Sequence, residues 1–327
     1  MLEIVFIVFI NHPSICINNY RSTEDTNMNQ ISQVVKILKE QSNQGNDLSL
    51  LNAPLLQKIT TKMRNSEELV FLLPAFPAKS PSPLKTLGEL PDLGEVLALE
   101  GLQSICAQIS NIYNPGAKII ICSDGRVFSD VVNVSDETIN NYQIGIENII
   151  KEFNFNHIEL FSLDDLYPDL KKDKLREVLL ERFGKDIDEV KSLVCANEEY
   201  NRLFNGLHRF LIEDELGLNP LLTKNQAKKM TKSRTYELIR RSDAWSELIN
   251  FHFQDHLRLS IHSYPAHHEK FGIKLVASSS KWATPWHNVT VKIKDKFELM
   301  HLQEALKLNA TLKMLKDKYA YFEITEA

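Results

Sequence analysis

The sequence VFLLPAFPAKSPSPLK at 70–85, continued by KIIICSDGRVFSD at 118–130, decides the fold of this chain. Its apolar runs Phe71–Pro74 and Lys118–Cys122 have the length of buried strands. Asp92–Tyr113, which lies between them, carries apolar residues at helical spacing and is stopped by Asn114-Pro115-Gly116. Strand, helix and strand in this order predict a βαβ unit with parallel strands and a right-handed crossover.

The remaining sequence extends this unit in both directions. Helical patterns cover Ile31–Glu40, Pro54–Met63, a segment that begins at Ser135, and the charged residues 169–250. Strand patterns follow at His157–Phe161, Leu257–His262, Gly272–Val276 and Val289–Ile293, the last three at hairpin-like separation. We predict an α/β, Rossmann-like fold: a mainly parallel sheet flanked by helices, a helical middle segment, and additional C-terminal strands that join the same sheet.

These patterns divide the chain into two parts. Residues 31–327 are expected to form one α/β domain with a helical insertion at about 169–250. Residues 1–30 are interpreted as a disordered or mis-annotated extension, because polar residues follow the apolar start and Met28 offers a second start.

Composition bounds the class of protein. The 327 residues are 43% hydrophobic and 25% charged, as in ordinary globular chains, and the net charge of −5 argues against a general nucleic-acid binder. The four cysteines are scattered and are expected to be reduced thiols. The apolar start MLEIVFIVFI is too short to span a bilayer and lacks the basic flank of a signal peptide. We therefore expect a cytoplasmic protein without a membrane partner.

Polar side chains follow the first strand of the unit. Lys79 and Ser80 lie in a proline-rich loop, and Lys85 adds a second cation to the same loop. Ligands of open α/β sheets bind outside the carboxyl ends of the strands, and prolines reduce the entropy that a loop loses on binding. These three residues are therefore candidates for binding an anionic substrate, and a solvated loop is the alternative.

The second strand ends in an equally polar segment. Ser123 and Arg126 supply a hydroxyl and a guanidinium that suit a carboxylate or phosphate, and Asp124 suits an ammonium group. A structural pair between Asp124 and Arg126 is the alternative. Phe76 and Phe128, one in each loop, are candidates for contacting an aromatic side chain, with core packing as the alternative.

A third group lies near the C-terminus. Arg258, Ser260 and His262 alternate with apolar residues, so they share one face of a strand, which is either an exposed face or the floor of a pocket. In the pocket interpretation, the His262 imidazole transfers protons. His287 is a further binding candidate, and Glu95, at the start of a helix, is a further acid–base candidate.

Several standard motifs are missing from the sequence. It contains no G-x-G-x-x-G, no G-x-x-x-x-G-K-[ST], no H-E-x-x-H and no G-x-S-x-G. Dinucleotide binding, a zinc site and a serine-hydrolase triad are therefore unsupported. The residues alone indicate an α/β enzyme with a cationic pocket for a small anionic or phosphorylated substrate.

Five segments resemble the pyoverdine/dityrosine biosynthesis family, the isocyanide (isonitrile) synthases. They are LPAFPAKSPSPLKTLGELPDLGE at 73–95, SDGRVFSDVVNVSDETINNY at 123–142, RLSIHS at 258–263, KFGIKL at 270–275 and TPWHN at 284–288. The resemblance covers residues 65–295, and its first two segments are long and unusual in composition.

The resemblance implies an activity. Family members convert the α-amino group of an aromatic L-amino acid into an isocyanide and take the carbon from ribulose 5-phosphate as co-substrate, so no metal and no organic cofactor is implied. Tyrosine is the favoured amino acid, with tryptophan as the alternative. The resemblance also implies a pathway partner, an Fe(II)/2-oxoglutarate-dependent oxygenase that receives the product.

Residue chemistry then suggests individual roles. The expected anion-binding cations are Lys79, Lys85, Arg126 and Arg258, and the expected proton-transfer groups are His262, Asp124 and Glu95. Two other functions stay open at this point: another α/β enzyme acting on a sugar phosphate, of the aldolase or isomerase type, and a non-catalytic module that binds a small ligand.

Overall fold

The computed structural model of the chain describes residues 28–42, 53–264, 268–278 and 283–324. Residues 1–27 of the predicted extension over residues 1–30 lie outside the described residues. Residues 28–30 already belong to a helix that continues to residue 40, where a helix over Ile31–Glu40 was expected. No helix among the described residues has both the length and the apolar character needed to cross a bilayer.

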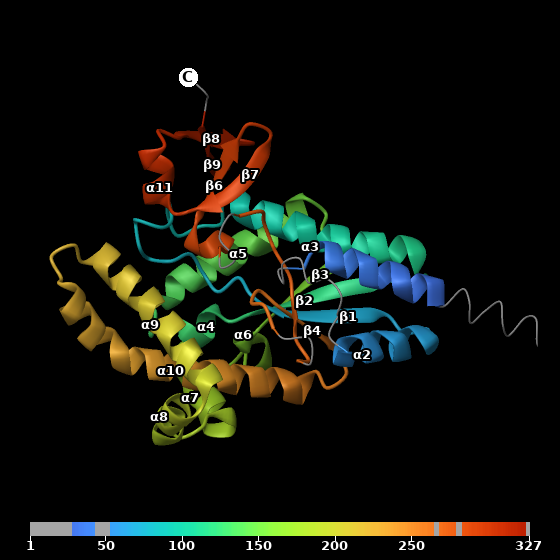
Figure 1. Ribbon diagram of the computed structural model, residues 1–327, viewed down its shortest axis with the longest axis horizontal. Coiled ribbons are helices and arrows are strands. Elements are labelled where there is room, and N and C mark those ends of the chain that lie inside the picture. The colour runs from blue at the N-terminus through green and yellow to red at the C-terminus, as the bar shows by residue number, and fades with distance from the viewer. Residues whose placement is uncertain (1–27, 43–52, 265–267, 279–282, 325–327) are drawn as a thin grey trace, which may run out of the picture.

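A five-stranded sheet forms the centre of the molecule (Figure 1). Its strands are β1 (Leu69–Pro74), β2 (Ala117–Ser123), β3 (Ile158–Ser162), β4 (Leu257–Ser260) and β5 (Phe271–Gly272). The spatial order is β3-β2-β1-β4-β5, and every neighbouring pair is parallel. The predicted βαβ unit is confirmed as β1, helix α3 (Leu93–Ile112) and β2.

The strand order creates a crevice at one place. From β1 the chain first adds β2 and β3 on one side, and it returns after the helical segment to add β4 on the other side of β1. Connections that leave neighbouring strands in opposite directions open a gap above their carboxyl ends, where ligands of such sheets bind. The topological switch point between β1 and β4 is therefore the expected position of the site.

Helices cover both faces of the sheet. One face packs against α2 (Ala53–Arg64), α3 and α5 (Asp136–Glu152), and the other against α7 (Lys172–Phe183) and α10 (Lys224–His252). The helix starts follow the predicted chemistry: Asp92 and Glu95 form a capping box at α3, and the Ser135 hydroxyl accepts from the Thr138 N–H at α5.

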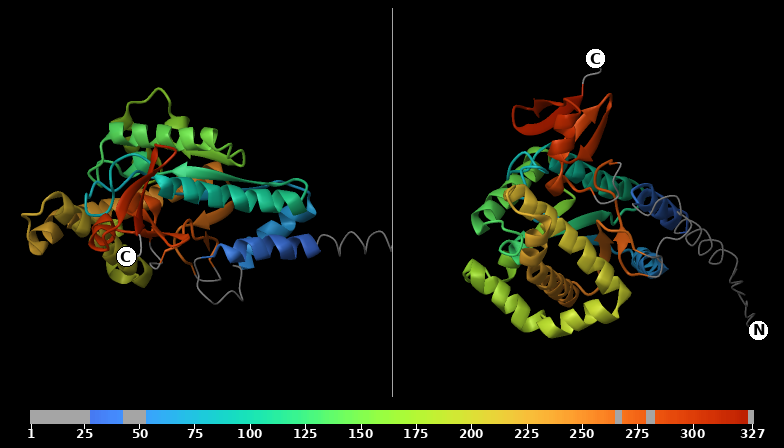
Figure 2. Two further views of the ribbon diagram at one scale, coloured as in Figure 1. Left: turned by 90° about the horizontal axis from the view of Figure 1, so that it is seen from above. Right: turned by 60° about the vertical axis from the view of Figure 1, so that its left-hand side comes forward.

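The helical middle segment is confirmed. It contains α7, α8 (Ile187–Ala196), α9 (Glu198–Leu218) and α10, and a Thr223–Gln226 capping box begins the 29-residue α10. Two short helices, α4 (Gly125–Phe128) and α6 (Leu163–Leu166), follow β2 and β3. In the right-hand view of Figure 2, α7 and α8 lie at the opposite end of the molecule from the C-terminal strands.

The prediction that all C-terminal strands join one sheet is wrong. β4 and β5 do join the central sheet, but they are parallel neighbours and not a hairpin. The predicted strand at Val289–Ile293 is β6 of a second sheet, ordered β7-β6-β9-β8. The other elements of this unit are β7 (Lys296–Met300), α11 (Leu302–Lys307), β8 (Thr311–Leu315) and β9 (Tyr319–Ile324). Its sheet and α11 bury their own apolar cluster, which includes Val291, Ala305 and Phe322, and this second core holds β6 away from the central sheet.

Candidate active site

The loop after β1 is bound to the Thr-Pro-Trp-His-Asn segment, which lies far away in the sequence. The backbone N–H of Ser80 donates to the Trp286 carbonyl at 2.7 Å, and the Lys79 ammonium donates to the Pro285 carbonyl at 2.9 Å. The Phe76 and Trp286 rings lie 5.2 Å apart between centres. Phe76 has a φ of 59° and is 1% exposed, so it packs in the core at a bend that few side chains tolerate. Two of the segments that carry the resemblance thus form one structure.

A buried ionic network lies beneath this loop. The Lys79 ammonium is 2.8 Å from Asp92 Oδ2 and 2.9 Å from Glu95 Oε2, and the Tyr142 hydroxyl donates to Glu95 Oε1 at 3.1 Å. Burial raises the pKa of Glu95 to about 7, although the Lys79 charge opposes that shift. Burial opposes the charge of Lys79, but the two carboxylates raise its pKa above the ordinary value. In this conformation Lys79 is enclosed by three protein oxygens and braces the loop.

Ser80 and Lys85 belong to a second network, centred on Asp214 of α9. The Ser80 hydroxyl donates to Asp214 Oδ1 at 3.0 Å, and the Lys85 ammonium lies 2.8 Å from the same oxygen and 4.8 Å from the centre of the Phe210 ring. The His287 ring contacts the Phe210 ring, with 4.7 Å between the ring centres and an angle of 48° between the ring planes. Removal from water, followed by the charge of Lys85, lowers the pKa of His287 to about 3, so this imidazole is neutral at pH 7.

The loops after β1 and β2 touch each other. The Ser123 hydroxyl donates to the Phe76 carbonyl at 3.0 Å and accepts from the Gln143 amide at 3.3 Å. A Cβ atom on Gly125 would lie 1.9 Å from the Pro77 carbonyl oxygen, so only glycine fits at this crossing. The two loops therefore meet at the carboxyl edge of the sheet.

The Asp124 carboxyl group lies at this edge of the sheet and has a strongly raised pKa. It is half-buried at the end of β2, and its buried Oδ1 atom has no hydrogen-bond partner among the residues that the structure describes. Burial raises the pKa of Asp124 to about 7. A carboxyl group with a pKa near the working pH and an unused oxygen is suited to accept and return a proton.

Arg126 has a different environment from the one expected. It is 0% exposed, and its guanidinium pairs with Asp136 at 2.7 Å and Asp164 at 3.1 Å and also donates to Asn140. Hydrogen bonds from Arg176 and Arg126 overcome burial and lower the pKa of Asp136 to about 2. The structural pair considered from the sequence involved Asp124, whereas the structure gives Arg126 two other carboxylates.

Phe128 is half-buried at the end of α4. It packs where two apolar clusters meet, next to Val127 and to Val131. This environment corresponds to the core-packing alternative, as for Phe76.

The face of β4 is arranged as the alternation predicted. Leu257 and Leu259 are 0% exposed in the main core, and Arg258 and Ser260 point to the opposite face. That face is also covered, because the Arg258 guanidinium donates to Asn250 of α10 at 2.6 Å. Of the four predicted anion-binding cations, Arg258 alone has no carboxylate within 4.0 Å among the residues that the structure describes, and its buried Nε has no acceptor.

The predicted strand over Leu257–His262 ends at Ser260, so His262 lies two residues beyond β4 and not on its face. Its backbone N–H donates to the Ser260 hydroxyl at 3.0 Å. Removal from water, followed by the charge of Lys270, lowers the pKa of His262. The imidazole is therefore neutral near pH 7 and able to accept a proton.

Four residues of this region were not identified from the sequence. Tyr142 was expected only as core, and Asp214 lies inside a charged helical stretch without a local signal. Tyr264 and Lys270 follow β4, and Lys270 opens the KFGIKL segment that carried the resemblance without receiving a role. Attention to charged residues inside the resembling segments would have identified Lys270.

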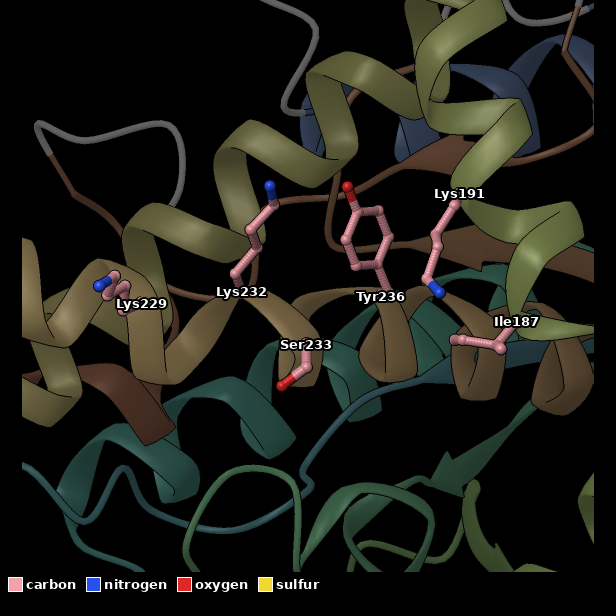
Figure 3. A pocket seen from close by; sticks show the side chains of 6 residues that line it. All are labelled: Ile187, Lys191, Lys229, Lys232, Ser233 and Tyr236. Carbon is pink, nitrogen blue, oxygen red and sulfur yellow. The ribbon is translucent and has the colours of Figure 1, made fainter.

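A separate lysine-lined pocket lies away from the sheet, between α8 and α10 (Figure 3). It is lined by Ile187, Lys191, Lys229, Lys232, Ser233 and Tyr236. Lys191 is paired with Asp188 at 2.7 Å. None of the segments that carry the resemblance contributes to this pocket.

Comparisons with known proteins find similar sequences over most of the chain. A family model described as pyoverdine/dityrosine biosynthesis protein matches residues 59–313. L-tryptophan isonitrile synthase AmbI2 of Fischerella ambigua is 44% identical over 278 residues, which cover 85% of this chain and 84% of that protein. L-tyrosine isonitrile synthase of Xenorhabdus nematophila is 39% identical over 262 residues, or 79% of this chain and 78% of that protein.

A solved structure confirms the fold as well. The crystal structure of PvcA from Pseudomonas aeruginosa matches with a TM-score of 0.84 at 34% identity, and the match covers 90% of this chain and 99% of that one. The resemblance carried by the five sequence segments is thereby confirmed. The chain belongs to the pyoverdine/dityrosine biosynthesis family and is an enzyme of its isonitrile synthase type.

Proposed function

We propose that this enzyme converts the α-amino group of an aromatic L-amino acid into an isocyanide, with ribulose 5-phosphate as the source of the carbon and without a metal or organic cofactor. The observation that carries the proposal is the similarity, over about four-fifths of the chain, to proteins named as L-tryptophan and L-tyrosine isonitrile synthases. Because the two named substrates differ, the proposal covers both amino acids and does not retain the preference for tyrosine.

The first chemical step sets the demands on the site. The free amine attacks the C2 ketone of the pentulose phosphate, and loss of water gives an imine. Two carbon–carbon bonds must then break. C1 departs as formaldehyde and leaves its bonding electrons on C2, and C3 departs with the electrons of the C2–C3 bond and takes up the proton lost from the C1 hydroxyl, so that C2 remains on the nitrogen as the isocyanide carbon. The substrate ammonium must lose a proton before it attacks, and the departing hydroxyl must gain one, so the site needs groups that titrate near neutral pH.

Asp124 and His262 meet this demand best. Asp124 has an unpartnered Oδ1 atom and a pKa of about 7, and His262 has a lowered pKa that keeps it neutral. We assign deprotonation of the amine to Asp124 and a second proton transfer to His262. Glu95 has a pKa of about 7 as well, but its two oxygens are engaged by Lys79 and Tyr142, so it serves better as a buried support.

The cations divide into two groups under this proposal. Lys79, Lys85 and Arg126 are paired with carboxylates and hold the loops around the substrate, while Arg258 binds an anionic group of the substrate. Loops that are fixed in advance also keep water away from the imine, which water would hydrolyse.

Two wider expectations belong to the same proposal. The product is expected to pass to an Fe(II)/2-oxoglutarate-dependent oxygenase, because the isocyanide still carries an amino-acid side chain and carboxylate open to oxidation. A cytoplasmic location fits the buried free thiols Cys106 and Cys122, which reducing conditions preserve.

The test is an incubation of the purified protein with ribulose 5-phosphate labelled with ¹³C at C2 and either L-tyrosine or L-tryptophan. The proposal expects an isocyanide whose terminal carbon carries the label, identified by mass spectrometry. Consumption of the sugar phosphate without the amino acid would instead indicate an aldolase or isomerase. Binding of both compounds without any turnover would indicate a ligand-binding module.

A further inference from the structure

We propose that Arg258 on β4 and Lys270, the residue just before β5, form the site that binds the phosphate group of the substrate. This inference rests on the proposed function in taking ribulose 5-phosphate as the ligand. It gives a role to the KFGIKL segment, and Lys270 becomes the second cation of a pair.

The register of the two strands brings the residues together. β4 and β5 are parallel, with Leu259 beside Phe271 and Ser260 beside Gly272. Continued back by one residue, this register places Lys270, just before β5, beside Arg258. Because side chains alternate along a strand, both cations share the face of Ser260, whereas Leu259 and Phe271 point to the core on the other face.

The charges at this place favour an anion. Arg258 is 6% exposed, its Nη1 donates to the neutral Asn250 side-chain amide, and its buried Nε has no acceptor within the described part of the chain. Burial and the adjacent Arg258 charge lower the pKa of Lys270, and burial lowers the pKa of Arg258. Two neighbouring cations that are partly removed from water are costly unless an anion lies between them. A phosphate dianion supplies two charges and several acceptor oxygens.

Neighbouring groups add hydroxyls. Tyr264 hydrogen-bonds to Ser260, and the Lys270 ammonium lies 5.4 Å from the centre of the Tyr264 ring. Gly272, beside Ser260, adds no side chain to this face. The group lies next to the β1–β4 switch point, so a sugar held there by its phosphate extends toward Asp124 at the end of β2.

The other cations of the site do not offer this arrangement. The Lys79 ammonium is 2.8 Å from Asp92, the Lys85 ammonium is 2.8 Å from Asp214, and the Arg126 guanidinium is 2.7 Å from Asp136. An anion would have to displace a carboxylate at each of them.

The decisive variant is Lys270→Gln, assayed with ribulose 5-phosphate and with ribulose, which lacks the phosphate. Losing one charge-assisted hydrogen bond lowers affinity about ten- to a hundredfold, so the KM for ribulose 5-phosphate is expected to rise by that factor. Turnover of ribulose should change much less, because no phosphate remains to be bound. The KM for the amino acid should not change, and Lys270→Arg should retain most of the affinity.

Two matched controls carry the same change of charge. Lys274→Gln lies on the same segment at an exposed position, and Lys232→Gln lies in the lysine-lined pocket between α8 and α10 (Figure 3). Both should behave like the unmodified enzyme. The melting temperature of Lys270→Gln should stay equal or rise. The lowered pKa of Lys270 means that its charge is unfavourable in the folded protein, and glutamine removes that charge.

Calorimetry separates this inference from the proposed function. If the protein forms no isocyanide, titration with ribulose 5-phosphate and with inorganic phosphate still compares the unmodified protein with Lys270→Gln and with Arg258→Lys. Weaker binding in both variants supports the phosphate site even then. An unchanged affinity in a folded Lys270→Gln protein, or an equal loss for ribulose and ribulose 5-phosphate, would overturn it.

Discussion

Replacing Asp124 with asparagine should move activity and stability in opposite directions. The carboxyl group lies at the end of β2 with Oδ1 buried and unpartnered. Asparagine has almost the same shape but cannot accept a proton from the substrate ammonium. General acid–base groups contribute about 10²–10⁴-fold to rate, and we expect a loss of kcat in that range for Asp124→Asn.

The gain in stability follows from the shifted pKa. Burial raises the pKa of Asp124 to about 7, against an ordinary value near 3.9. The folded chain therefore binds this proton more tightly than the unfolded chain, and stability is lost as the pH rises from about 4 through about 7. A difference of about three pKa units corresponds to at most about 4 kcal/mol of unfolding free energy at pH 8. The neutral amide of asparagine carries no such cost, so we expect the variant to be about 2–4 kcal/mol more stable at pH 8.

Two measurements test this prediction together. Urea unfolding at pH 5 and pH 8 should show little difference between the proteins at the lower pH and a more stable variant at the higher pH. Steady-state kinetics should show the loss in kcat with a smaller change in KM. A variant that keeps nearly full activity would refute the catalytic role, and one that is less stable at pH 8 would refute the burial argument.

Four other perturbations test the supporting structure. Lys79→Met leaves Asp92 and Glu95 buried without their cation, so urea unfolding should show a loss of about 3–5 kcal/mol. Arg126→Met should lose a similar amount of about 3–5 kcal/mol. Stability that depends on a lowered carboxyl pKa is lost as the pH falls from about 4 toward 2, and the pKa of Asp136 in the unmodified protein is about 2, so Arg126→Met should also make stability less sensitive to acid. Circular dichroism against pH measures both effects. If the Arg126→Met protein were stable but inactive, Arg126 would instead bind the anionic substrate. Gly125→Ala forces a Cβ atom against the Pro77 carbonyl, and melting temperature and kcat should fall together. Binding of ribulose 5-phosphate should raise the pKa of His262, seen by NMR of the imidazole, because the phosphate cancels the charge of Lys270; an unchanged value would place the phosphate elsewhere.

Local patterns predicted the central fold well. The apolar runs of β1 and β2, the stripe of α3 and the capping residues Asp92 and Ser135 are short-range signals, and each marks its element correctly. The choice of sheet for β6 was not accessible in this way. Its alternating pattern is the same in either sheet, and the decision depends on α11 and β9, which bury Val291 from a distance in the sequence.

In the candidate site, too, local sequence patterns predicted some features, and others depend on residues far away in the chain. Alternation correctly placed Arg258 and Ser260 opposite the core. Residue type alone could not show which cations have a counter-ion, because the partners lie elsewhere in the chain: Asp214 for Lys85, and Asp164 for Arg126. A sequence shows that a charge is present, whereas its availability to a ligand depends on long-range packing.

The position of the cation pair also links substrate binding to proton transfer. Without the sugar phosphate, burial and the charge of Lys270 keep the pKa of His262 low, so the imidazole is neutral and cannot act as an acid, while Asp124 takes the proton of the ammonium substrate. A phosphate dianion beside Lys270 reverses that influence and favours the protonated imidazole, which can then protonate the departing hydroxyl as the imine forms. The phosphate group does not react, but its binding would thus promote the departure of the hydroxyl from C2. On this reasoning, removing the phosphate from the substrate should lower kcat as well as affinity, since His262 would keep the protonation state of the empty site.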